Sequence, residues 1–431
     1  MRKRRPKAVI LSRDRHGISR RDIDHDALKV LYRLDRRGHT ACLVGGAVRD
    51  LLMGRTPKDF DIGTSAHPNQ VRRLFRNSML VGRRFRLAHI RFGPKIIECS
   101  TFRRKPEPVD ATNEEEDSLY QHHDNSFGTM EEDAQRRDFT VNGIMYNIRG
   151  FEVIDYVGGL DDIRRKVIRT IGDPDIRMSE DPVRMLRAIR FASRLGFRID
   201  RRTWKSILKL HGEILKASPS RLTEEVQQLF AYGSGHDAMR LLRKSGLMKD
   251  LLPWVDDHLS TSADKGKLFW RCLKALDASE AAGDAPSAAL TYGAVSYPMF
   301  AERMAELRAS GYRVSPLSIA REVLHDDAGG LRLPKWAFYR VSHVLEAQRR
   351  FENWKGGRFS KRRFVARREF RDAAIIYDIQ TEARGIKPGR RQPWMELYRE
   401  CGPGERTEKR AAPVRSRRRR GRRRRRGRRR P

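Results

Sequence analysis

The 431-residue sequence predicts an α+β fold, with a small mixed α/β head followed by an all-helical neck and body. Two observations support this prediction. Short apolar runs bounded by glycine, and a Gly93-Pro94 hairpin signal, lie within residues 21–170, as expected of short strands. From Ile176 onward, apolar residues recur at helical spacing over nearly the whole chain. The chain is too long for one ordinary core, so we expect several domains.

Each element of the head follows from its local pattern. Apolar residues at helical spacing predict a helix over 23–34, and the run 41–44 predicts a strand that ends at a glycine pair. The polar, acidic stretch 105–130 predicts a mobile loop, or a lid that orders when substrate binds. The other expected head elements are helices over 47–53 and 69–75, strands over 59–62, 87–92, 95–102 and 151–156, and a structured segment over 139–146.

The pattern divides the chain into five parts. The expected parts are a flexible basic arm (1–20), the head (21–170), a helical neck (171–250), a helical RNA-binding body (251–400) and a disordered Arg-rich tail (401–431). Within the neck, the periodicity predicts helices over 182–195, 201–215, 221–231 and 238–244.

Charge and cysteine content restrict the partners. The formal net charge is +37, and the segment after Cys401 holds sixteen Lys or Arg against two Glu. A basic body with a basic tail favours a polyanion, most simply nucleic acid, although the tail alone is equally consistent with a solubility role. The four widely spaced cysteines disfavour zinc and disulfides, and no apolar run is long enough to span a membrane. We expect a cytoplasmic monomer.

The chemistry is concentrated in a glycine pair and an acidic pair of the head. Side chains two apart on a strand share a face, so Asp59 and Asp61 are expected to point together, with Phe60 packed behind them. Two close carboxylates repel each other. Mg²⁺, which takes hard oxygen ligands and leaves room for phosphates, is the expected counter-charge, with Mn²⁺ as the alternative. Gly45 and Gly46 let the backbone approach a triphosphate and open a helix whose N-terminus favours anions.

Arg49 follows the glycine pair and is expected to pair with phosphate or with a local carboxylate. An isolated Asp-x-Asp pattern is weak, since many such patterns are solvated turns. Gly-Gly, Arg-Asp and Asp-x-Asp within seventeen residues, however, resemble the head motif of the nucleotidyltransferase superfamily, in its tRNA nucleotidyltransferase and poly(A) polymerase branch. The resemblance covers roughly residues 16–255. It implies a nucleotidyltransferase head that works with two metal ions bound by Asp59 and Asp61.

A two-metal site is expected to use a third carboxylate. The candidates are Asp138, which follows Arg136 and Arg137, and Glu98, on an expected strand. The family has an Arg-Arg-Asp motif linked to the sugar and triphosphate and to the catalytic centre, so the resemblance implies a catalytic Asp138. Glu98 is equally well read as an exposed carboxylate on the other face. Arg136 and Arg137 suit the triphosphate as bidentate donors, against the alternative of a surface salt bridge.

A Glu-Asp-x-x-Arg run begins at Glu180. On one helix, Asp181, Arg184 and Arg187 would follow i,i+3 steps along a single face. A carboxylate and a guanidinium together offer an acceptor and donors to a base edge, although an amphipathic helix with internal salt bridges is the plainer alternative. In the resembling family this motif selects the nucleotide. The resemblance therefore implies base selection by Asp181 and Arg184, and nucleotide contact by Arg187.

Arg221 and Glu224 match a further motif of the family, which supports the nucleotide-selecting helix beside Glu180. Three segments favour the bacterial poly(A) polymerases over the CCA-adding enzymes, because they resemble a signature of the former, as does the basic tail. These segments are 16–19, 76–89 and 124–129.

The resemblance implies a template-independent polynucleotide adenylyltransferase, which adds AMP from ATP to RNA 3′ ends and serves RNA polyadenylation and turnover. A CCA-adding tRNA nucleotidyltransferase is the alternative with the same chemistry. A non-catalytic RNA-binding protein on the same scaffold is the alternative from another class. In each case the helical body and tail are expected to follow the RNA backbone without reading sequence.

Overall fold

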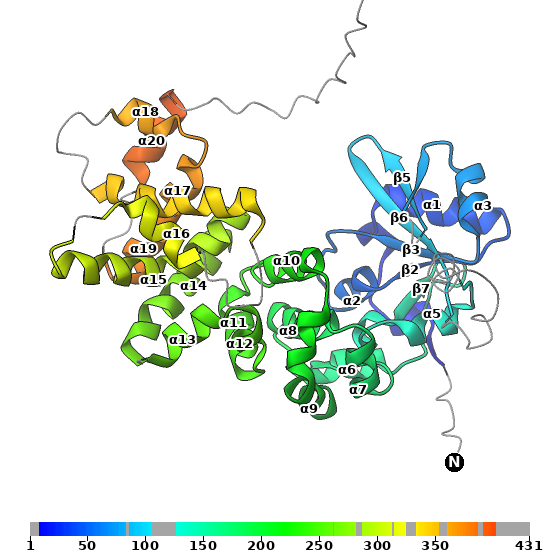
Figure 1. Cartoon of the computed structure of the whole chain (residues 1–431). Coiled ribbons are helices and arrows are strands. Elements are labelled where there is room, and N and C mark those ends of the chain that lie inside the picture. Colours follow the sequence, from blue (N-terminus) through cyan, green and yellow to red (C-terminus); the bar gives the residue numbers. More distant parts are fainter. Residues whose placement is uncertain are drawn as a thin grey trace, which may run out of the picture.

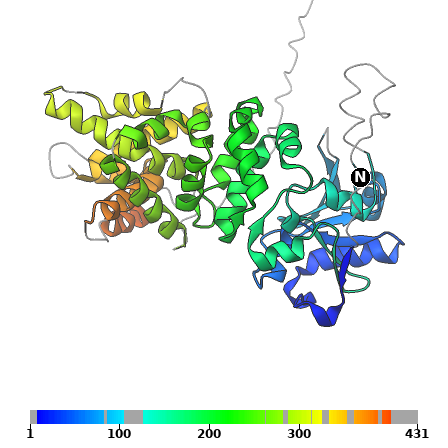
Figure 2. The same cartoon turned by 90° about the horizontal axis from the view of Figure 1, so that it is seen from below.

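The α+β class is confirmed: a head built on a sheet lies at one end of the molecule, a helical neck in the middle and a helical body at the other end (Figure 1 and Figure 2). The computed structural model describes residues 8–82, 86–104, 126–261, 263–281, 287–312, 314–324, 333–352, 360–386 and 391–401. Residues 1–7 of the arm, 83–85 and 124–125 of the signature segments, the acidic stretch 105–125 and the tail after Cys401 lie outside the described residues.

An eight-stranded mixed sheet forms the head, in the order β1-β8-β7-β2-β3-β6-β5-β4. Strands β3 and β6 are parallel, and the other neighbours are antiparallel. The strands are β1 (Val9–Leu11), β2 (Ala41–Val44), β3 (Asp61–Thr64), β4 (Ser78–Val81), β5 (Leu87–Phe92), β6 (Lys95–Thr101), β7 (Ile144–Asn147) and β8 (Glu152–Asp155). In the neck, β9 (Val167–Ile168) and β10 (Arg198–Ile199) form a small parallel pair.

The central strand β2 contributes to both faces of the sheet because successive side chains of a strand point to opposite sides. Leu43 joins the head core beneath α1 (His25–Arg36) and α3 (Pro68–Leu74). Val44 joins a smaller cluster on the face covered by α5 (Met130–Arg136). Helix α2 (Gly46–Leu52) continues directly from the end of β2. The residues after β2 thereby lie at the C-terminal end of a central strand, near α5.

Helix α5 lies next to a stretch that the sequence predicted to be loop as far as Met130, and no helix was expected here. A capping box starts it: the Thr129 hydroxyl accepts from the Glu132 N–H at 3.3 Å, and the Glu132 carboxylate accepts from the Thr129 N–H at 2.7 Å. These bonds satisfy backbone donors that the first helical turn leaves unpaired. Local capping chemistry therefore compensates for a segment poor in apolar residues.

The expected flexible arm is wrong for its described part. Val9–Leu11 forms β1, which pairs antiparallel with β8 at the sheet edge. Farther along, His16 Nε2 hydrogen-bonds the carbonyl of Phe151 at 2.8 Å. The sequence did not predict this strand because its β-branched residues, Val9 and Ile10, lie in an arginine-rich segment. Its partner strand is also about 140 residues away in the chain.

The neck and body share one apolar core, which extends from Phe139 to Trp394, while the head has its own. None of the helices in the described part of the chain is long and apolar enough to cross a membrane. The helices are α6 (Gly159–Arg165), α7 (Pro174–Glu180), α8 (Val183–Leu195), α9 (Arg201–Leu210), α10 (Pro219–Gln228), α11 (Gly235–Lys244), α12 (Leu247–Leu251), α13 (Pro253–Thr261), α14 (Ala263–Ala281), α15 (Ala288–Ala309), α16 (Pro316–Leu324), α17 (Lys335–Glu352), α18 (Lys361–Val365), α19 (Phe370–Ala383) and α20 (Gln392–Cys401).

Candidate active site

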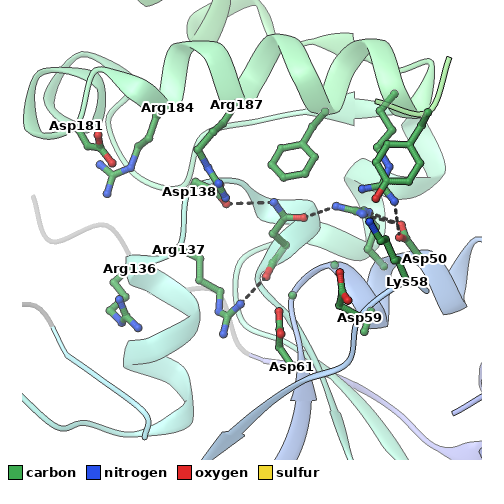
Figure 3. A pocket seen from close by; sticks show the side chains of 18 of the residues that line it. Asp50, Lys58, Asp59, Asp61, Arg136, Arg137, Asp138, Asp181, Arg184 and Arg187 are labelled. Atoms are coloured by element: carbon green, nitrogen blue, oxygen red, sulfur yellow. Dashed lines mark hydrogen bonds and ion pairs between the residues drawn. The ribbon is translucent and has the colours of Figure 1, made fainter. Parts of the chain in front are cut away.

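A cavity of about 500 Å³ opens where the head sheet and α5 meet α8 of the neck. In Figure 3, Asp59 and Asp61 lie across the cavity from the helix that carries Arg184 and Arg187. Of the residues expected from the sequence, those that line the cavity are Gly45, Gly46, Arg49, Asp59, Asp61, Arg136, Arg137, Asp138, Asp181, Arg184, Arg187 and Arg221. Glu98, Glu180 and Glu224 are not part of its lining.

The acidic pair lies at the start of β3, but this strand begins two residues later than expected. Strand β2 ends at Val44, which pairs with Asp61, because the chain turns at Gly45 with φ +71°. A side chain would strain this conformation, and an added Cβ would lie 3.0 Å from an Arg137 nitrogen. Strand β3 therefore begins at Asp61, and Asp59 lies in the loop before it. Both carboxylates still line the cavity.

Negative charge accumulates around Asp61. Its side chain opens to the cavity, but the protein surrounds it on the other sides. The parallel pairing of β3 with β6 places Glu98 beside it on the same face of the sheet, not on the opposite one. Burial first, and then Glu98 and Asp59, raise the pKa of Asp61 to about 6, against the opposing effect of Arg137. Glu98 itself is half exposed and contacts His89 at 3.4 Å.

Arg136 and Arg137 are both held by one buried carboxylate, Asp133, for which the sequence reading had no role. Its Oδ1 accepts from Nε and Nη2 of Arg136 at 3.1 and 2.9 Å, and its Oδ2 accepts from Nε and Nη2 of Arg137 at 3.2 and 3.0 Å. Burial alone would raise the pKa of Asp133, but the two guanidinium groups outweigh it and lower the pKa. The i,i+3 and i,i+4 spacing along α5 was the signal that could have found this residue.

Asp138 is engaged by Arg187 rather than by the acidic pair. Its Oδ2 accepts from Nε and Nη2 of Arg187 at 2.8 and 2.6 Å, and its Oδ1 accepts from the Phe139 N–H and from Asn142. Burial opposes ionisation, yet Arg187 and these bonds hold the pKa of Asp138 at about 2. In the described part of the chain, no three His, Cys, Asp or Glu side chains converge as a metal site. The expected trio of Asp138 with the two aspartates is therefore not formed.

Asn142 lines the cavity and links Arg49 to Asp138. It accepts from Nη1 of Arg49 at 2.6 Å and donates to Asp138 at 3.1 Å. Arg49 is almost completely buried, and its other donors bind Asp50 at 2.7 and 2.8 Å. Of the two expected roles of Arg49, pairing with a local carboxylate is the one observed.

The sequence predicted that Glu180 to Arg187 lie on one helix, but the structure divides them between two helices. Helix α7 ends at Glu180 and α8 begins at Val183. Asp181 is extended, with φ −148°, because the residue before a proline is disfavoured in the helical region. Because Asp181 lies between the two helices, its carboxylate faces the cavity.

The two expected base-selecting residues do not pair with each other. Both oxygens of Asp181 accept from Arg221, each at 2.9 Å, and the bond raises the pKa of Arg221. Arg184 donates through Nη1 to the carbonyl of Arg177 at 2.7 Å and lies 3.3 Å from Glu180. Each is thus fixed by a neighbour while its functional group borders the cavity.

Glu225, rather than the expected Glu224, supports α8. Its Oε1 accepts from Arg187 at 3.1 Å, and its Oε2 forms an ion pair with Arg190. Glu224 lies on the same helix, α10, but is exposed to solvent. Asp138 first, and then Glu225, raise the pKa of Arg187 above its usual value. The two positions are adjacent in sequence, and the sequence motif alone did not distinguish them.

Comparison with known proteins shows which class of enzyme has this architecture. Residues 41–169 match a family model described as the poly A polymerase head domain, and residues 196–259 match one described as the probable RNA and SrmB-binding site of polymerase A. The crystal structure of the Bacillus stearothermophilus CCA-adding enzyme in complex with CTP is 28% identical, with a TM-score of 0.58, and covers 87% of this chain and 80% of that chain. The chain is therefore an enzyme of the nucleotidyltransferase class, as expected.

The relatives narrow this class to one family. Poly(A) polymerase I of Salmonella typhi is 38% identical over 412 residues, which cover 93% of this chain and 88% of the relative. Poly(A) polymerase I of Escherichia coli O6:H1 is 38% identical over 408 residues. A CCA-adding enzyme of Bacillus velezensis is 37% identical over 225 residues, which cover 52% of this chain and 55% of the relative. The chain belongs to the bacterial poly(A) polymerase family.

Proposed function

We propose that the protein adds AMP from ATP to RNA 3′ ends without a template, in RNA polyadenylation and turnover. The observation that carries this proposal is the extent of similarity. Relatives named poly(A) polymerase I match 93% of the chain, including most of the body, whereas the CCA-adding relative matches 52%. The CCA-adding alternative rests on the same cavity and on the likeness to the CTP-bound structure.

The triphosphate has a preformed set of donors. Arg136 and Arg137 are oriented by Asp133 before any ligand arrives, so little side-chain entropy remains to be lost on binding. Lys58 adds a further cation to the lining. The bare backbone of Gly45 and Gly46 lets phosphate oxygens approach closely. We assign the triphosphate to this side of the cavity, next to the acidic pair.

Asp181 and Arg184 provide the base contact. Adenine presents a donor at N6 and an acceptor at N1 on its pairing edge, and a carboxylate with a guanidinium supplies the matching acceptor and donor. Cytosine presents the same order of groups, whereas guanine and uracil reverse it. The pair therefore selects adenine and cytosine against guanine and uracil, and the choice of adenine over cytosine requires additional contacts. Arg221 keeps the Asp181 carboxylate in place.

The acidic pair fits Mg²⁺. Asp59 and Asp61 offer hard oxygen ligands beside the proposed triphosphate, and a divalent cation would offset the repulsion between these neighbouring carboxylates. Mg²⁺ binds proteins through one or two carboxylates plus substrate phosphates, so two aspartates suffice. When bound, the ions lower the pKa of the attacking 3′-hydroxyl and stabilise charge on the phosphates. Mn²⁺ has the same ligand preference and is the alternative.

Asp138 then acts mainly by position. Held by Arg187, it joins α8 of the neck to the Arg-Arg-Asp segment of the head, and through Asn142 it orders the cavity floor. Arg187 in turn aligns the helix that presents Arg184. The RNA 3′-hydroxyl gives up its proton to water and attacks the α-phosphate in line. The new O–P bond forms as the bond from the α-phosphorus to the bridging oxygen breaks, and pyrophosphate leaves on the side of Arg136 and Arg137.

Primer extension tests this proposal. Purified protein, Mg²⁺ and a generic RNA are combined with each nucleoside triphosphate singly. A long ladder with ATP alone is the expected result, with no incorporation of GTP or UTP. Addition confined to CCA on tRNA lacking its end would assign the protein to the CCA-adding branch instead. Absence of incorporation under all conditions would overturn nucleotidyl transfer by this cavity.

A further inference from the structure

One aromatic side chain in the cavity has no role in the reaction described above. Tyr232 lines the cavity and is 47% exposed. Its φ of +68° is unfavourable for a residue with a side chain, and such strain is retained where surrounding contacts impose it, often at functional sites. The guanidinium carbon of Arg194 lies 3.9 Å from the centre of the ring, and Arg194 binds Asp50 at 3.2 Å. One face of the ring is thus fixed, and the exposed part borders the cavity.

The backbone around Tyr232 is anchored to α14 of the body. Glu280 accepts from the N–H groups of Tyr232, at 2.7 Å, and of Gly233. Asp277 accepts from the N–H groups of Gly235 and His236 at 2.9 and 3.0 Å. Two carboxylates of one helix therefore impose the strained conformation of the segment that connects the cavity with α11.

A second cavity, of about 670 Å³, begins at the end of this segment. It lies between α11 and α14, and we call it the α11/α14 groove. Cations three or four residues apart on each helix share a face, so both helices direct positive charge into it. No carboxylate is among the described residues that line it. The lining consists of His236, Arg240, Arg243, Lys244, Trp270, Arg271 and Lys274.

The groove charge is largely uncompensated. Arg243 lies 3.5 Å from Asp256, but Arg240, Lys244 and Lys274 are exposed and have no ion-pair partner among the described residues. Exposed cations of the same sign repel one another, so their concentration in one groove favours a polyanionic ligand. Trp270 adds a half-buried aromatic ring whose edge contacts include His236. Cations together with an accessible aromatic ring are typical of single-stranded nucleic-acid sites, where bases stack and phosphates are neutralised.

The two cavities lie close together, because residues only four apart in the chain line them. Tyr232 lines the first and His236 lines the second, and four residues of extended chain span at most about 14 Å. A few nucleotides of a single strand cover that distance, given one phosphate per about 3.4 Å of stacked strand.

We propose that the RNA strand behind the reacting 3′ end passes Tyr232 and enters the α11/α14 groove. The terminal base stacks on the open part of the Tyr232 ring. The phosphates a few nucleotides upstream contact Arg240, Lys244 and Lys274, and a base stacks near Trp270. This proposal rests on the proposed function, since it requires an RNA 3′ end in the cavity. It extends the matched RNA-binding segment, which ends at residue 259, to α14 of the body.

The groove is tested by a triple variant, Arg240→Gln with Lys244→Gln and Lys274→Gln. Binding of a fluorescent oligoadenylate of about twenty nucleotides is measured by anisotropy without ATP, at several salt concentrations. For a single strand, each phosphate contact contributes about −0.7 to the slope of log K against log salt concentration. The loss of three contacts is therefore expected to make this slope shallower by about 2. The control carries Arg36→Gln, Arg72→Gln and Arg73→Gln, exposed cations of the head on α1 and α3, and binds as the wild type does.

Tyr232 is tested separately. Tyr232→Ala is expected to raise KM for the RNA primer about tenfold with little change in KM for ATP, and Tyr232→Phe to restore it, since stacking needs the ring and not the hydroxyl. For the triple variant of the groove, the ratio of kcat/KM for the long primer to kcat/KM for a trinucleotide primer is expected to fall about tenfold.

The outcomes separate the two proposals. A wild type that binds the oligoadenylate but transfers no nucleotide would refute the proposed function alone. An active wild type whose triple variant binds RNA with unchanged affinity and salt slope would overturn the groove proposal and leave the function standing. Such a result would assign the basic groove to another polyanion, such as an acidic protein surface.

Discussion

The candidate active site and the α11/α14 groove both contain several cations, but the cations of the two regions are held differently. In the cavity, Asp133 fixes Arg136 and Arg137, and Asp138 fixes Arg187. In the groove, Arg243 lies near Asp256, but Arg240, Lys244 and Lys274 are exposed and have no carboxylate partner among the described residues. Transfer requires donors placed to within a fraction of an ångström, whereas attraction of a phosphate backbone requires only charge. We therefore propose that the paired cations serve nucleotide transfer and that the unpaired cations attract the RNA backbone.

The junction between head and neck explains why the paired cations lie where they do. The head has its own apolar core and a second core runs through neck and body, with Ile163 packed against both. Ion pairs such as Asp138 with Arg187 and Asp50 with Arg194 join the two parts. The cavity opens at this junction, so the residues that hold the molecule together also set the geometry of the site.

The largest expected effect comes from the acidic pair. Substituting both Asp59 and Asp61 by Ala removes the ligands proposed for Mg²⁺, and transfer is expected to fall at least about a thousandfold, because metal stabilisation of the reacting phosphate contributes several kcal/mol. Oligoadenylate binding to the groove stays within about twofold of wild type. Radiolabelled AMP incorporation and anisotropy measure the two effects. Incorporation near the wild-type rate would refute the proposed metal site.

Glu98→Gln is the matched control for this pair. Glu98 shares the face of Asp61 but does not line the cavity, so its loss is expected to cost less than about tenfold in incorporation. An effect as large as that of the double variant would make Glu98 a third metal ligand.

A smaller effect is expected from loosening the arginine pair. Asp133→Asn keeps the size of the side chain but weakens four charge-assisted bonds, and kcat/KM for ATP is expected to fall about 10- to 100-fold because misplaced donors lose transition-state contacts. Asp257→Asn, at an exposed site on α13, is the control and leaves steady-state kinetics unchanged. Equal kinetics of the two variants would mean that Asp133 does not orient the site.

Features formed by residues close together in the sequence could be predicted, whereas contacts between residues far apart in the chain could not. The hairpin of β5 and β6 and the helices of the neck follow from local patterns, and the glycine and aspartate motifs correctly predicted that their residues meet. The pairing of β1 with β8 and of Asp138 with Arg187 joins residues far apart, so no local pattern contains it. Asp133 was within reach of local reasoning, because its spacing to both arginines was visible.

Loss of the Asp138–Arg187 ion pair is expected to have a smaller effect, a decrease in stability that depends on pH. Because the pKa of Asp138 is lowered from 3.8 to about 2 in the folded protein, its ionised form stabilises the fold above about pH 4, and this contribution is lost as the pH falls towards 2. The shift corresponds to about 2 kcal/mol. Melting temperatures of the wild type and of Asp138→Asn, measured between pH 6 and 2, are expected to differ by a constant amount above about pH 4 and to converge below it. A constant difference over this range would contradict the assigned shift.

The smallest effect tests the comparison most directly. Arg137→Lys keeps the charge but loses the planar fork that Asp133 orients, so kcat/KM for ATP is expected to fall about tenfold. Arg240→Lys makes the same chemical change in the groove, where the geometry is free, and RNA affinity is expected to stay within about twofold. Kinetics and anisotropy on both variants give the result. If Arg240→Lys weakened RNA binding as strongly as Arg240→Gln, the groove would recognise RNA through a defined contact geometry, and the division between positioned and unpositioned cations would fail.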